Sequence, residues 1–320
     1  MFENGINKLF FTGSVPAGKQ LMAQAAQTLT PVSLELGGND PMVVLEDADL
    51  QRAASGAAWA GLSNTGQSCG GVERIYVHES VYDRFIELLS NEVKAMKHGA
   101  PTAAFNVDMG ALSTAKQQRT IETHLQDALE KGARITAQSQ RVGNEQGFYH
   151  PATVLVNVNH SMLTMQEETF GPLLPVMSFK TEDEAVALAN DSSMALSASV
   201  WTKDLKRGRA LAKRIESGVV AINDHLYTHG MPDLPWGGPK ESGIGRTHGP
   251  EGLLEMAKPK VINWDFTQPK QNLWWGPQNA ASYALMGQTI KLAAPKSVFE
   301  TVTVLLGILP AMLKKAFFGK

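Results

Sequence analysis

The sequence predicts an α/β protein whose core is a doubly wound, largely parallel sheet. Short apolar segments typical of strands alternate with helical segments along most of the chain. This alternation implies crossover helices that cover both faces of the sheet. The chain has 320 residues, of which 43% are hydrophobic. That is enough for one large domain or two modest ones, each with its own core.

The expected strands are short apolar runs, and the first of them ends at Gly13. A last, separate strand is expected late in the chain, over residues 260–266. Residues 267–297 are rich in Pro, Gln, Asn and Trp, and they predict a wrapping segment without a core of its own. The other expected strands cover residues 8–13, 32–38, 41–45, 74–78, 152–158, 173–179, 197–202 and 219–223.

The expected helices begin and end at residues that satisfy free backbone groups. Asp47 or Asp49 is the expected N-cap of the second helix, and Gly99 is the expected stop of the third. Thr181 and Glu184 have the spacing of a capping box. The helices cover residues 18–29, 47–64, 80–98, 113–132, 182–190 and 204–218.

Composition limits the classes of partner. The formal net charge is −2 and the isoelectric point is about 6.5, so neither nucleic acid nor an anionic membrane is expected as the main partner. The single cysteine excludes an internal disulfide and favours a reducing, cytoplasmic location. The first residues lack the apolar stretch of a signal peptide. We predict no metal site.

The only cysteine, Cys69, lies in the segment NTGQSCGG at residues 64–71. A solitary cysteine is commonly a buried, inert thiol, but such thiols normally have apolar neighbours. Small neighbours leave room for a substrate carbonyl and let backbone N–H groups point at one oxygen. A nucleophilic cysteine also needs a positive or dipolar environment, or a nearby base. No histidine lies close in sequence, so a Cys–His pair is not indicated.

Glu35 is a candidate for that base. It lies in the apolar segment LELGGND, and burial of a carboxyl raises its pKa toward the range that suits a general base. It precedes Cys69 by 34 residues, about the length of one βαβ unit. The alternative is an ion pair with a Lys or Arg elsewhere in the chain, and the local sequence alone favours this alternative.

The segment FTGSVPAGK, residues 11–19, is a candidate phosphate-binding turn. A strand ends at Gly13, Ser14 follows, and Pro16 and Gly18 open a helix. Glycines let the backbone approach a ligand, and a helix N-terminus favours a phosphate group. An ordinary strand–turn–helix joint explains the pattern equally well, since it matches neither common dinucleotide motif.

Two later stretches complete the set of candidates. In EETFGPLLPV, Glu168 is expected to bind ribose hydroxyls and Phe170 to pack against a flat ring, whereas the alternative is a simple Gly-Pro turn. The glycine-rich stretch PWGGPKESGIGR, residues 235–246, is either a surface loop or a rigid wall beside an active site.

The order and spacing of these motifs resemble the NAD(P)-dependent aldehyde dehydrogenase superfamily over roughly residues 8–266. The resemblance implies an aldehyde-dehydrogenase-like α/β fold and oxidation of an aldehyde to an acid through a thiohemiacetal and a thioester. It makes Cys69 the nucleophile and Glu35 the general base for hydrolysis. It makes Glu168 the ligand of the nicotinamide ribose, with Phe170 beside the nicotinamide. Gly13, Ser14 and Gly18 are then expected near the pyrophosphate of NAD or NADP.

The sequence departs from the family pattern at Val15, where the family has Thr, and it resembles only the family's C-terminal two-thirds. The segment after Cys69 resembles a subgroup that acts on fatty or aromatic aldehydes. The expected divisions are a remnant of the cofactor domain, a catalytic domain, a return helix with an oligomerisation-type strand, and a C-terminal extension. They cover residues 1–34, 35–248, 249–268 and 269–320 respectively.

Several partners and alternatives stay open. The missing third would hold most of the dinucleotide-binding sheet, so the chain is either the catalytic portion of an enzyme, an inactive remnant, or half of a split enzyme that needs a separate N-terminal chain. A complete protein is expected to form homo-oligomers. The apolar tail at residues 296–320 is either an interfacial membrane anchor or a helix packed over the substrate entrance. The particular aldehyde and the choice between NAD and NADP are not determined by the sequence.

Overall fold

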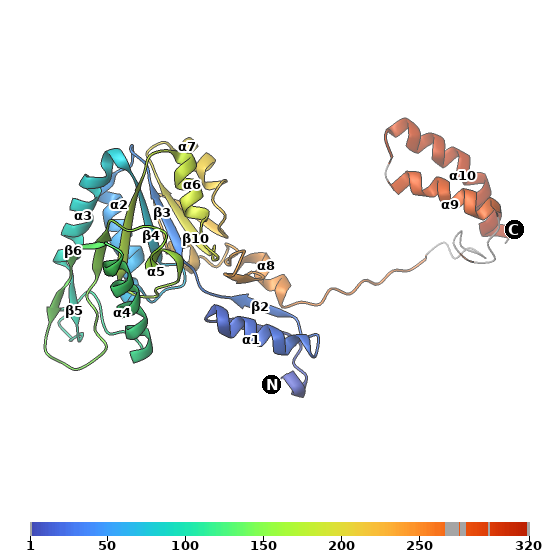
Figure 1. Cartoon of the computed structure of the whole chain (residues 1–320). Helices are drawn as coiled ribbons and strands as arrows, with labels where there is room; N and C mark the ends of the chain where they lie inside the picture. The colour runs from blue at the N-terminus through green and yellow to red at the C-terminus, as the bar shows by residue number, and fades with distance from the viewer. Residues whose placement is uncertain (1, 266–274, 276–279, 294, 319–320) are drawn as a thin grey trace. The chain divides into compact units, whose positions relative to one another are not determined.

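The computed structural model forms two compact units, Met1–Lys258 and Pro259–Lys320, each with its own packing (Figure 1). The first unit contains every residue that the sequence predicts for the site. The structure describes residues 2–265, 275, 280–293 and 295–318.

The first unit is built on a seven-stranded sheet with the order β11-β10-β3-β4-β9-β8-β6. Neighbouring strands from β11 to β8 are parallel, and only the last pair, β8 with β6, is antiparallel. The predicted α/β class is therefore confirmed. The strands are β3 (Asp40–Val44), β4 (Val72–His78), β6 (Arg134–Gln138), β8 (Thr153–Val156), β9 (Leu173–Phe179), β10 (Ser197–Trp201) and β11 (Val219–Ile222).

Helices cover both faces of this sheet, as Figure 1 shows. In β3, Met42 and Val44 pack into the core on one face, whereas Val43 points into the core on the other. Full burial of such a side chain contributes roughly 1.5–3 kcal/mol. The covering helices are α2 (Leu50–Leu62) and α3 (Tyr82–Ala95) on the first face, and α4 (Ala115–Glu130), α6 (Glu182–Asn190) and α7 (Leu205–Ala212) on the second.

Two smaller sheets complete the first unit. One has the order β1-β2-β12, in which β1 is parallel to β2 and β12 is antiparallel to it. In this sheet β1 is an edge strand, and its Phe10 is 40% exposed. The other sheet pairs β5 with β7. The bounds are β1 (Leu9–Thr12), β2 (Val32–Glu35), β5 (Lys97–Gly99), β7 (Gln140–Val142), β12 (Gly243–Ile244), α1 (Val15–Ala26), α5 (Leu163–Gln166) and α8 (Gly249–Glu255).

Helix caps decide some of the predicted boundaries. Asp49 caps α2, since its carboxylate accepts a hydrogen bond from the Arg52 amide at 3.2 Å. Thr181 caps α6 and accepts a hydrogen bond from the Glu184 amide at 3.2 Å. The Glu184 carboxylate accepts from the Lys180 amide, one residue before the expected partner.

Several predicted helix ends were wrong. Helix α1 (Val15–Ala26) begins and ends three residues before the expected 18–29, and α7 ends at Ala212 instead of residue 218. The helix that was expected to stop at Gly99 ends at Ala95, because the chain turns extended at Met96 and residues 97–99 pair with β7. The next helix begins after Thr114, whose hydroxyl accepts a hydrogen bond from the Gln117 amide at 3.1 Å. The N-cap is therefore one residue later than Ser113.

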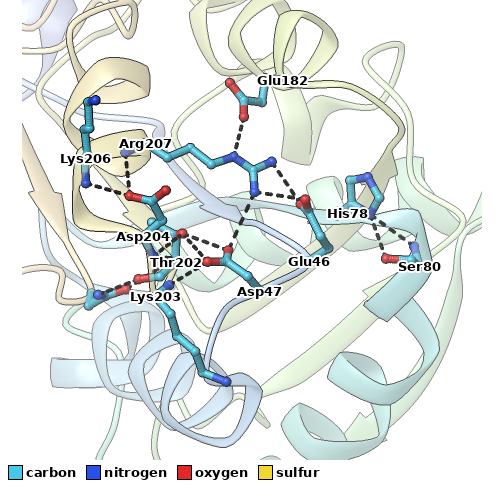
Figure 2. A network of polar contacts seen from close by, with 11 residues as sticks. Glu46, Asp47, His78, Ser80, Glu182, Thr202, Lys203, Asp204, Lys206 and Arg207 are labelled. Atoms are coloured by element: carbon cyan, nitrogen blue, oxygen red, sulfur yellow. Dashed lines mark hydrogen bonds and ion pairs between the residues drawn. The ribbon is translucent and has the colours of Figure 1, made fainter.

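The carboxyl ends of the parallel strands carry a polar network centred on Arg207, shown in Figure 2. Its guanidinium donates to Glu182 and, through two nitrogens at 2.9 and 3.1 Å, to Glu46. Beside it, Asp47 accepts hydrogen bonds from the Thr202 hydroxyl at 2.7 and 2.8 Å. Asp47 therefore joins β3 to β10, and it is not the cap of α2.

The oligomerisation-type strand that the sequence predicts at 260–266 stays a prediction, because such a strand pairs with a second chain. Residues 260–265 form no strand, and Val261 and Ile262 are 91% and 74% exposed. A β-strand needs the backbone of a second strand to satisfy its N–H and C=O groups. No such partner pairs with these residues in the described part of the chain. Phe266 lies outside the described residues.

The wrapping segment predicted at 267–297 was wrong in part, because Ala280–Ala293 forms helix α9. Its Leu285 packs against Ile308 of α10 (Val298–Phe318), and both side chains are buried. Residues 267–274, 276–279 and 294 lie outside the described residues. No helix in the described ranges combines the length and apolarity needed to cross a membrane.

Candidate active site

The predicted catalytic residues meet where two sheets face each other within the first unit. Glu35 is the last residue of β2, at the carboxyl end of the small parallel pair. Cys69 lies in the loop that leads into the amino end of β4, and Glu168 lies in the loop before β9. The site therefore lies at the amino ends of the seven-stranded sheet, opposite the Arg207 network.

The loop that presents Cys69 is tightly turned. Asn64 and Thr65 have positive φ values of 53° and 62°. Gly66, at φ +72°, contacts the backbone of Gly171, where an added Cβ would lie 2.3 Å from the carbonyl carbon. Only glycine fits that approach at this φ. The loop leaves the Cys69 thiol partly exposed.

Glu35 lies beside Cys69. The Glu35 carboxylate accepts a hydrogen bond from the indole Nε1 of Trp236 at 3.0 Å, and the Cys69 thiol is near enough that the two groups shift each other's pKa. Glu35 is 6% exposed, and burial raises its pKa, while the hydrogen bond from Trp236 and the Cys69 thiol oppose that rise. The structure thus brings the predicted nucleophile beside the predicted base, and the ion pair that the local sequence favours for Glu35 is absent from the described residues.

The charge around Cys69 differs from the positive environment considered in the sequence analysis. Burial raises the pKa of the Cys69 thiol strongly, and the carboxyl groups of Glu35, Asp40 and Glu168 raise it further. The thiol is therefore neutral at rest. A neutral thiol needs a base beside it when it attacks, and Glu35 occupies that place.

Glu168 lies over a cradle of two glycines. An added Cβ at Gly37 would lie 2.4 Å from Oε2 of Glu168, and the Gly38 amide donates to Oε1 at 3.3 Å. Burial raises the pKa of Glu168 to about 7, and the charge of Glu35 adds to this effect. An added Cβ at Gly38 would meet the carbonyl oxygen of Cys69 at 2.2 Å. The two glycines that follow Glu35 therefore allow all three predicted residues to approach one another.

Glu73 is a site residue that the sequence analysis missed. It is 5% exposed, and its carboxylate accepts hydrogen bonds from the amides of Thr169 and Phe170 at 2.8 and 2.7 Å. It thereby fixes the loop that carries Glu168 and Phe170 to the strand that follows Cys69. Burial raises the pKa of Glu73. The sequence shows only that Glu73 follows the cysteine by four residues. Nothing in the sequence indicates which residues Glu73 contacts.

A second missed group lies behind the cysteine loop. The Nε2 of His225 lies 3.1 Å from the carbonyl oxygen of Gly70 and 3.4 Å from Oγ of Ser197. Ser197 in turn donates from its backbone N, at 3.0 Å, and from its hydroxyl to Asp40. Burial lowers the pKa of His225 to about 4, so the imidazole is neutral and donates from Nε2. These contacts hold the residue that follows Cys69 in place.

The stretch 235–246 is a wall of the site. The Ser242 hydroxyl donates to the carbonyl of Gly37 at 2.7 Å, and Gly243 pairs with Glu35 in an antiparallel bridge. An added Cβ at Gly243 would lie 2.0 Å from the backbone oxygen of Leu34. Of the two alternatives, the rigid wall therefore applies.

The predicted phosphate-binding residues lie at the same end of the small sheet as Glu35. The Gly13 amide donates to the carbonyl of Glu35 at 3.1 Å. Ser14 is the exposed N-cap residue of α1, and its side chain makes no cap hydrogen bond. Gly18 is buried, and an added Cβ there would lie 2.7 Å from the side chain of Leu36. Gly18 therefore permits close packing of α1 on β2, and its place near the pyrophosphate stays a prediction.

Other features of the first unit fit a dinucleotide. The α1 N-terminus presents free backbone N–H groups and the unengaged Ser14 hydroxyl, which suit a phosphate. The Glu168 carboxylate over Gly37 suits a ribose hydroxyl. Phe170, held at φ 49°, is partly exposed in the same loop. Among the described residues, no group of His, Cys, Asp and Glu side chains has the arrangement of a metal site.

The model of the aldehyde dehydrogenase family matches residues 1–262. The chain therefore belongs to the aldehyde dehydrogenase family. It is 41% identical over 276 residues to 4,4'-diapolycopene aldehyde oxidase of Methylomonas sp, a match that covers 86% of this chain and 51% of that protein. It is 40% identical over 254 residues to the NADP(+) succinate-semialdehyde dehydrogenase GabD of Escherichia coli (strain K12), which covers 78% and 52%. The chain spans about half the length of the curated relatives it matches.

Solved structures give the same result. Betaine aldehyde dehydrogenase from Staphylococcus aureus, in complex with NAD+, is 36% identical with a TM-score of 0.73, covering 82% of this chain and 54% of that one. Lactaldehyde dehydrogenase from Escherichia coli is 36% identical with a TM-score of 0.76, covering 80% and 53%. By their names, these relatives act on aldehydes, and NAD and NADP both occur among them.

Proposed function

We propose that this site oxidises an aldehyde to a carboxylic acid, with NAD or NADP as the oxidant and Cys69 as the nucleophile. The observation that carries the proposal is the place of the Glu35 carboxylate beside the Cys69 loop. Trp236 donates to Glu35 at 3.0 Å while its ring lies against Gly70. Gly38 approaches the carbonyl oxygen of Cys69. A solitary thiol with a strongly raised pKa reacts slowly by itself, whereas a carboxylate beside it can take its proton during attack.

The reaction begins when Sγ of Cys69 attacks the aldehyde carbon and Glu35 takes the thiol proton. In this scheme the backbone N–H of Cys69 would donate to the oxygen of the resulting thiohemiacetal. A bound NAD or NADP would supply the hydride acceptor for that carbon, and Cys69 would then carry the acyl group as a thioester. Glu35 then releases the thiol proton to solvent and takes a proton from water, whose oxygen attacks the thioester. The acid leaves as Glu35 returns this second proton to the sulfur of Cys69.

In this scheme Glu168 and Ser14 would hold the ribose and the pyrophosphate of the cofactor. The raised pKa of Glu168, about 7, lets this carboxyl act as acceptor or donor to a hydroxyl near neutral pH. Glu73 and His225 would keep the two loops in register, since each bonds to backbone groups within two residues of a predicted site residue.

The test is the formation of NADH or NADPH and of the acid from succinate semialdehyde, lactaldehyde and a long apolar aldehyde. It is run with this chain alone and with a separately produced dinucleotide-binding part added. Glu35→Gln is expected to slow hydrolysis of the thioester more than the first turnover, and Cys69→Ser to abolish both. A Cys69→Ser variant as active as the parent would contradict the proposal. The absence of acid in both arms would favour an inactive remnant.

We also infer that the second unit binds an anionic lipid surface. Along α10, Val298, Val302, Leu305, Leu309 and Leu313 recur at helical spacing and are 47–82% exposed. The opposite flank of the helix packs on α9, so the exposed stripe is a separate face. Residues 280–320 contain five lysines and one glutamate, a net charge of +4 in a chain of net charge −2. A cationic segment with an apolar face suits the interface of an anionic membrane.

Vesicle sedimentation tests this inference. Leu305→Asp adds a charge to the apolar stripe and is expected to reduce sedimentation with anionic vesicles at least several-fold. Gly307→Asp is the matched control, because an added Cβ at Gly307 would meet no atom within 4 Å and the residue lies off the stripe. Equal sedimentation of the two variants, or of the parent with and without anionic vesicles, would contradict lipid binding.

A further inference from the structure

Trp236 links the two catalytic residues from the glycine-rich wall. Its side chain is 4% exposed, and its indole Nε1 donates to Oε1 of Glu35 at 3.0 Å. The far edge of the same ring lies on the cysteine loop, where an added Cβ at Gly70 would lie 2.9 Å from Cη2. One rigid side chain thus contacts both the base and the residue next to the nucleophile.

The backbone of Trp236 is itself held. Its amide donates to the carbonyl of Thr247 at 2.7 Å, and the Thr247 amide donates back at 2.8 Å. Gly243, farther along the same wall, pairs with Glu35. The ring of His229 packs against the indole edge-on, with 6.0 Å between the centroids. An indole has two side-chain torsions, so these contacts leave the N–H little freedom to turn away from Glu35.

We propose that Trp236 is a positioning residue that holds the Glu35 carboxylate against the Cys69 thiol through its indole N–H. The proposal rests on the proposed function only in what it says about catalysis. The contact itself concerns residues of this chain and needs neither an aldehyde nor a dinucleotide. A phenyl ring at this position would keep an aromatic side chain in the wall, but it would not reach Gly70 as Cη2 does and would leave Oε1 without this donor.

The groups around Glu35 determine whether removal of the indole N–H raises or lowers the pKa of Glu35. His229 and His248 lower its pKa, as does the Cys69 thiol beside it, whereas burial raises it. Glu35 and Glu168 lie close enough to repel each other. The indole N–H favours the charged carboxylate, so its removal raises the pKa of Glu35. The other groups stay in place when Trp236 becomes Phe.

The first experiment follows the indole N–H signal of Trp236 by nitrogen–proton NMR as the pH changes. The chain has six tryptophans, so a missing signal in Trp236→Phe assigns the residue. In the parent this signal is expected to shift as Glu35 titrates, and in Glu35→Gln the shift is expected to vanish. Trp201 is the matched control, because it is also buried but donates at 2.9 Å to a neutral hydroxyl, that of Ser199.

The second experiment measures the pKa of Glu35 from its carboxyl carbon signal, assigned with Glu35→Gln. Trp236→Phe is expected to raise this pKa by about one pH unit, the usual size for loss of a hydrogen bond to a charged group. Trp201→Phe is expected to leave it unchanged. Because Cys69 is the only cysteine, its alkylation rate gives a further profile. The change in alkylation rate that accompanies the titration of Glu35 is expected to occur at a higher pH in Trp236→Phe, by the same amount as the pKa shift.

A Glu35 titration that leaves the Trp236 signal unmoved would overturn the proposal, as would an unchanged pKa in a folded Trp236→Phe. The parent and Glu35→Gln measurements decide the matter even where Trp236→Phe fails to fold. Neither experiment uses turnover. A chain that passes both but oxidises no aldehyde would contradict the proposed function and leave the positioning contact established.

Discussion

The acidic side chains at the two ends of the seven-stranded sheet differ in their exposure and in the groups that donate hydrogen bonds to them. At the amino ends, Asp40 and Glu73 are at most 5% exposed and take their hydrogen bonds from uncharged donors. At the carboxyl ends, the acidic side chains are about a third exposed and gather around the guanidinium of Arg207, as Figure 2 shows.

The difference appears in the proton affinity of each group. Burial raises the pKa of Asp40 and Glu73 well above the ordinary range. The hydrogen bond from Arg207 instead lowers the pKa of Glu46. At the amino ends of the strands, folding therefore disfavours the charged form of the acidic side chains. At the carboxyl ends of the strands, folding favours the charged form. A cluster of disfavoured charges in a partly open site is typical of catalytic centres.

The cations differ in the same way, and the largest expected effect follows from this. Arg74 is fully buried and donates to the carbonyl oxygens of Asn39 at 2.9 Å, Leu188 at 3.0 Å and Ala189 at 2.9 Å. Arg74→Met leaves these buried oxygens without a donor. The free energy of unfolding is expected to fall by about 3–5 kcal/mol. Denaturant unfolding measures it, and a loss below about 1 kcal/mol would show that water replaces the guanidinium.

An intermediate effect is expected in the pH dependence of stability. The pKa of Glu168 is raised to about 7 in the folded protein. Its contribution to stability is therefore complete below the ordinary pKa of a glutamate, near 4.5, and is lost as the pH rises through about 7. Glu168→Gln is expected to remove this loss, which is about 1–3 kcal/mol.

Glu46→Gln is the matched control for that slope, because the pKa of Glu46 is lowered in the folded protein. Its contribution is present above the ordinary glutamate pKa and is lost as the pH falls. The two variants are thus expected to change the slope of stability against pH in opposite directions. Unfolding curves at several pH values between about 4 and 8 measure the slope for the parent and for both variants. If both substitutions change the slope in the same direction, the comparison is refuted.

The smallest effect is expected at Arg207. Its partners are partly exposed, and exposed ion pairs contribute about 0–1 kcal/mol each. Arg207→Met is expected to cost about 1 kcal/mol in dilute buffer and less in concentrated salt, since salt screens surface charges. Denaturant unfolding at two salt concentrations checks this. A cost equal to that of Arg74→Met at both concentrations would remove the distinction between the two ends.

Local signals in the sequence were sufficient for most helices and strands of the first unit. Residues 182–190 and 173–179 match α6 and β9 to the residue, because a capping box and a bounded apolar run act over a few neighbouring residues. The failures have a different cause. Residues 97 and 98 were expected to belong to a helix, but they lie in β5 and pair with β7, a partner that the local sequence does not reveal.

The candidate site divides in the same way. The order and spacing of the motifs were enough to select Cys69, Glu35 and Glu168 as candidates, although the immediate neighbours of Glu35 alone favoured an ion pair. Glu73 and His225 have no such local signature. Their roles depend on Thr169 and Gly70, which lie about 100 and 155 residues away in the chain. Contacts of that range exist only after the strands have been ordered in the sheet.

The sequence by itself determined the fold class, because hydrophobic periodicity and crossover lengths are local properties that a parallel sheet requires. It also determined which residue types were available for chemistry. Only the tertiary structure decided their charge. Cys69 was open to a positive or an anionic setting until the β2 and β9 loops placed Glu35 and Glu168 beside it and burial removed the water. A pKa depends on solvent exclusion and on distances between residues far apart in the chain, and neither quantity is written in a linear sequence.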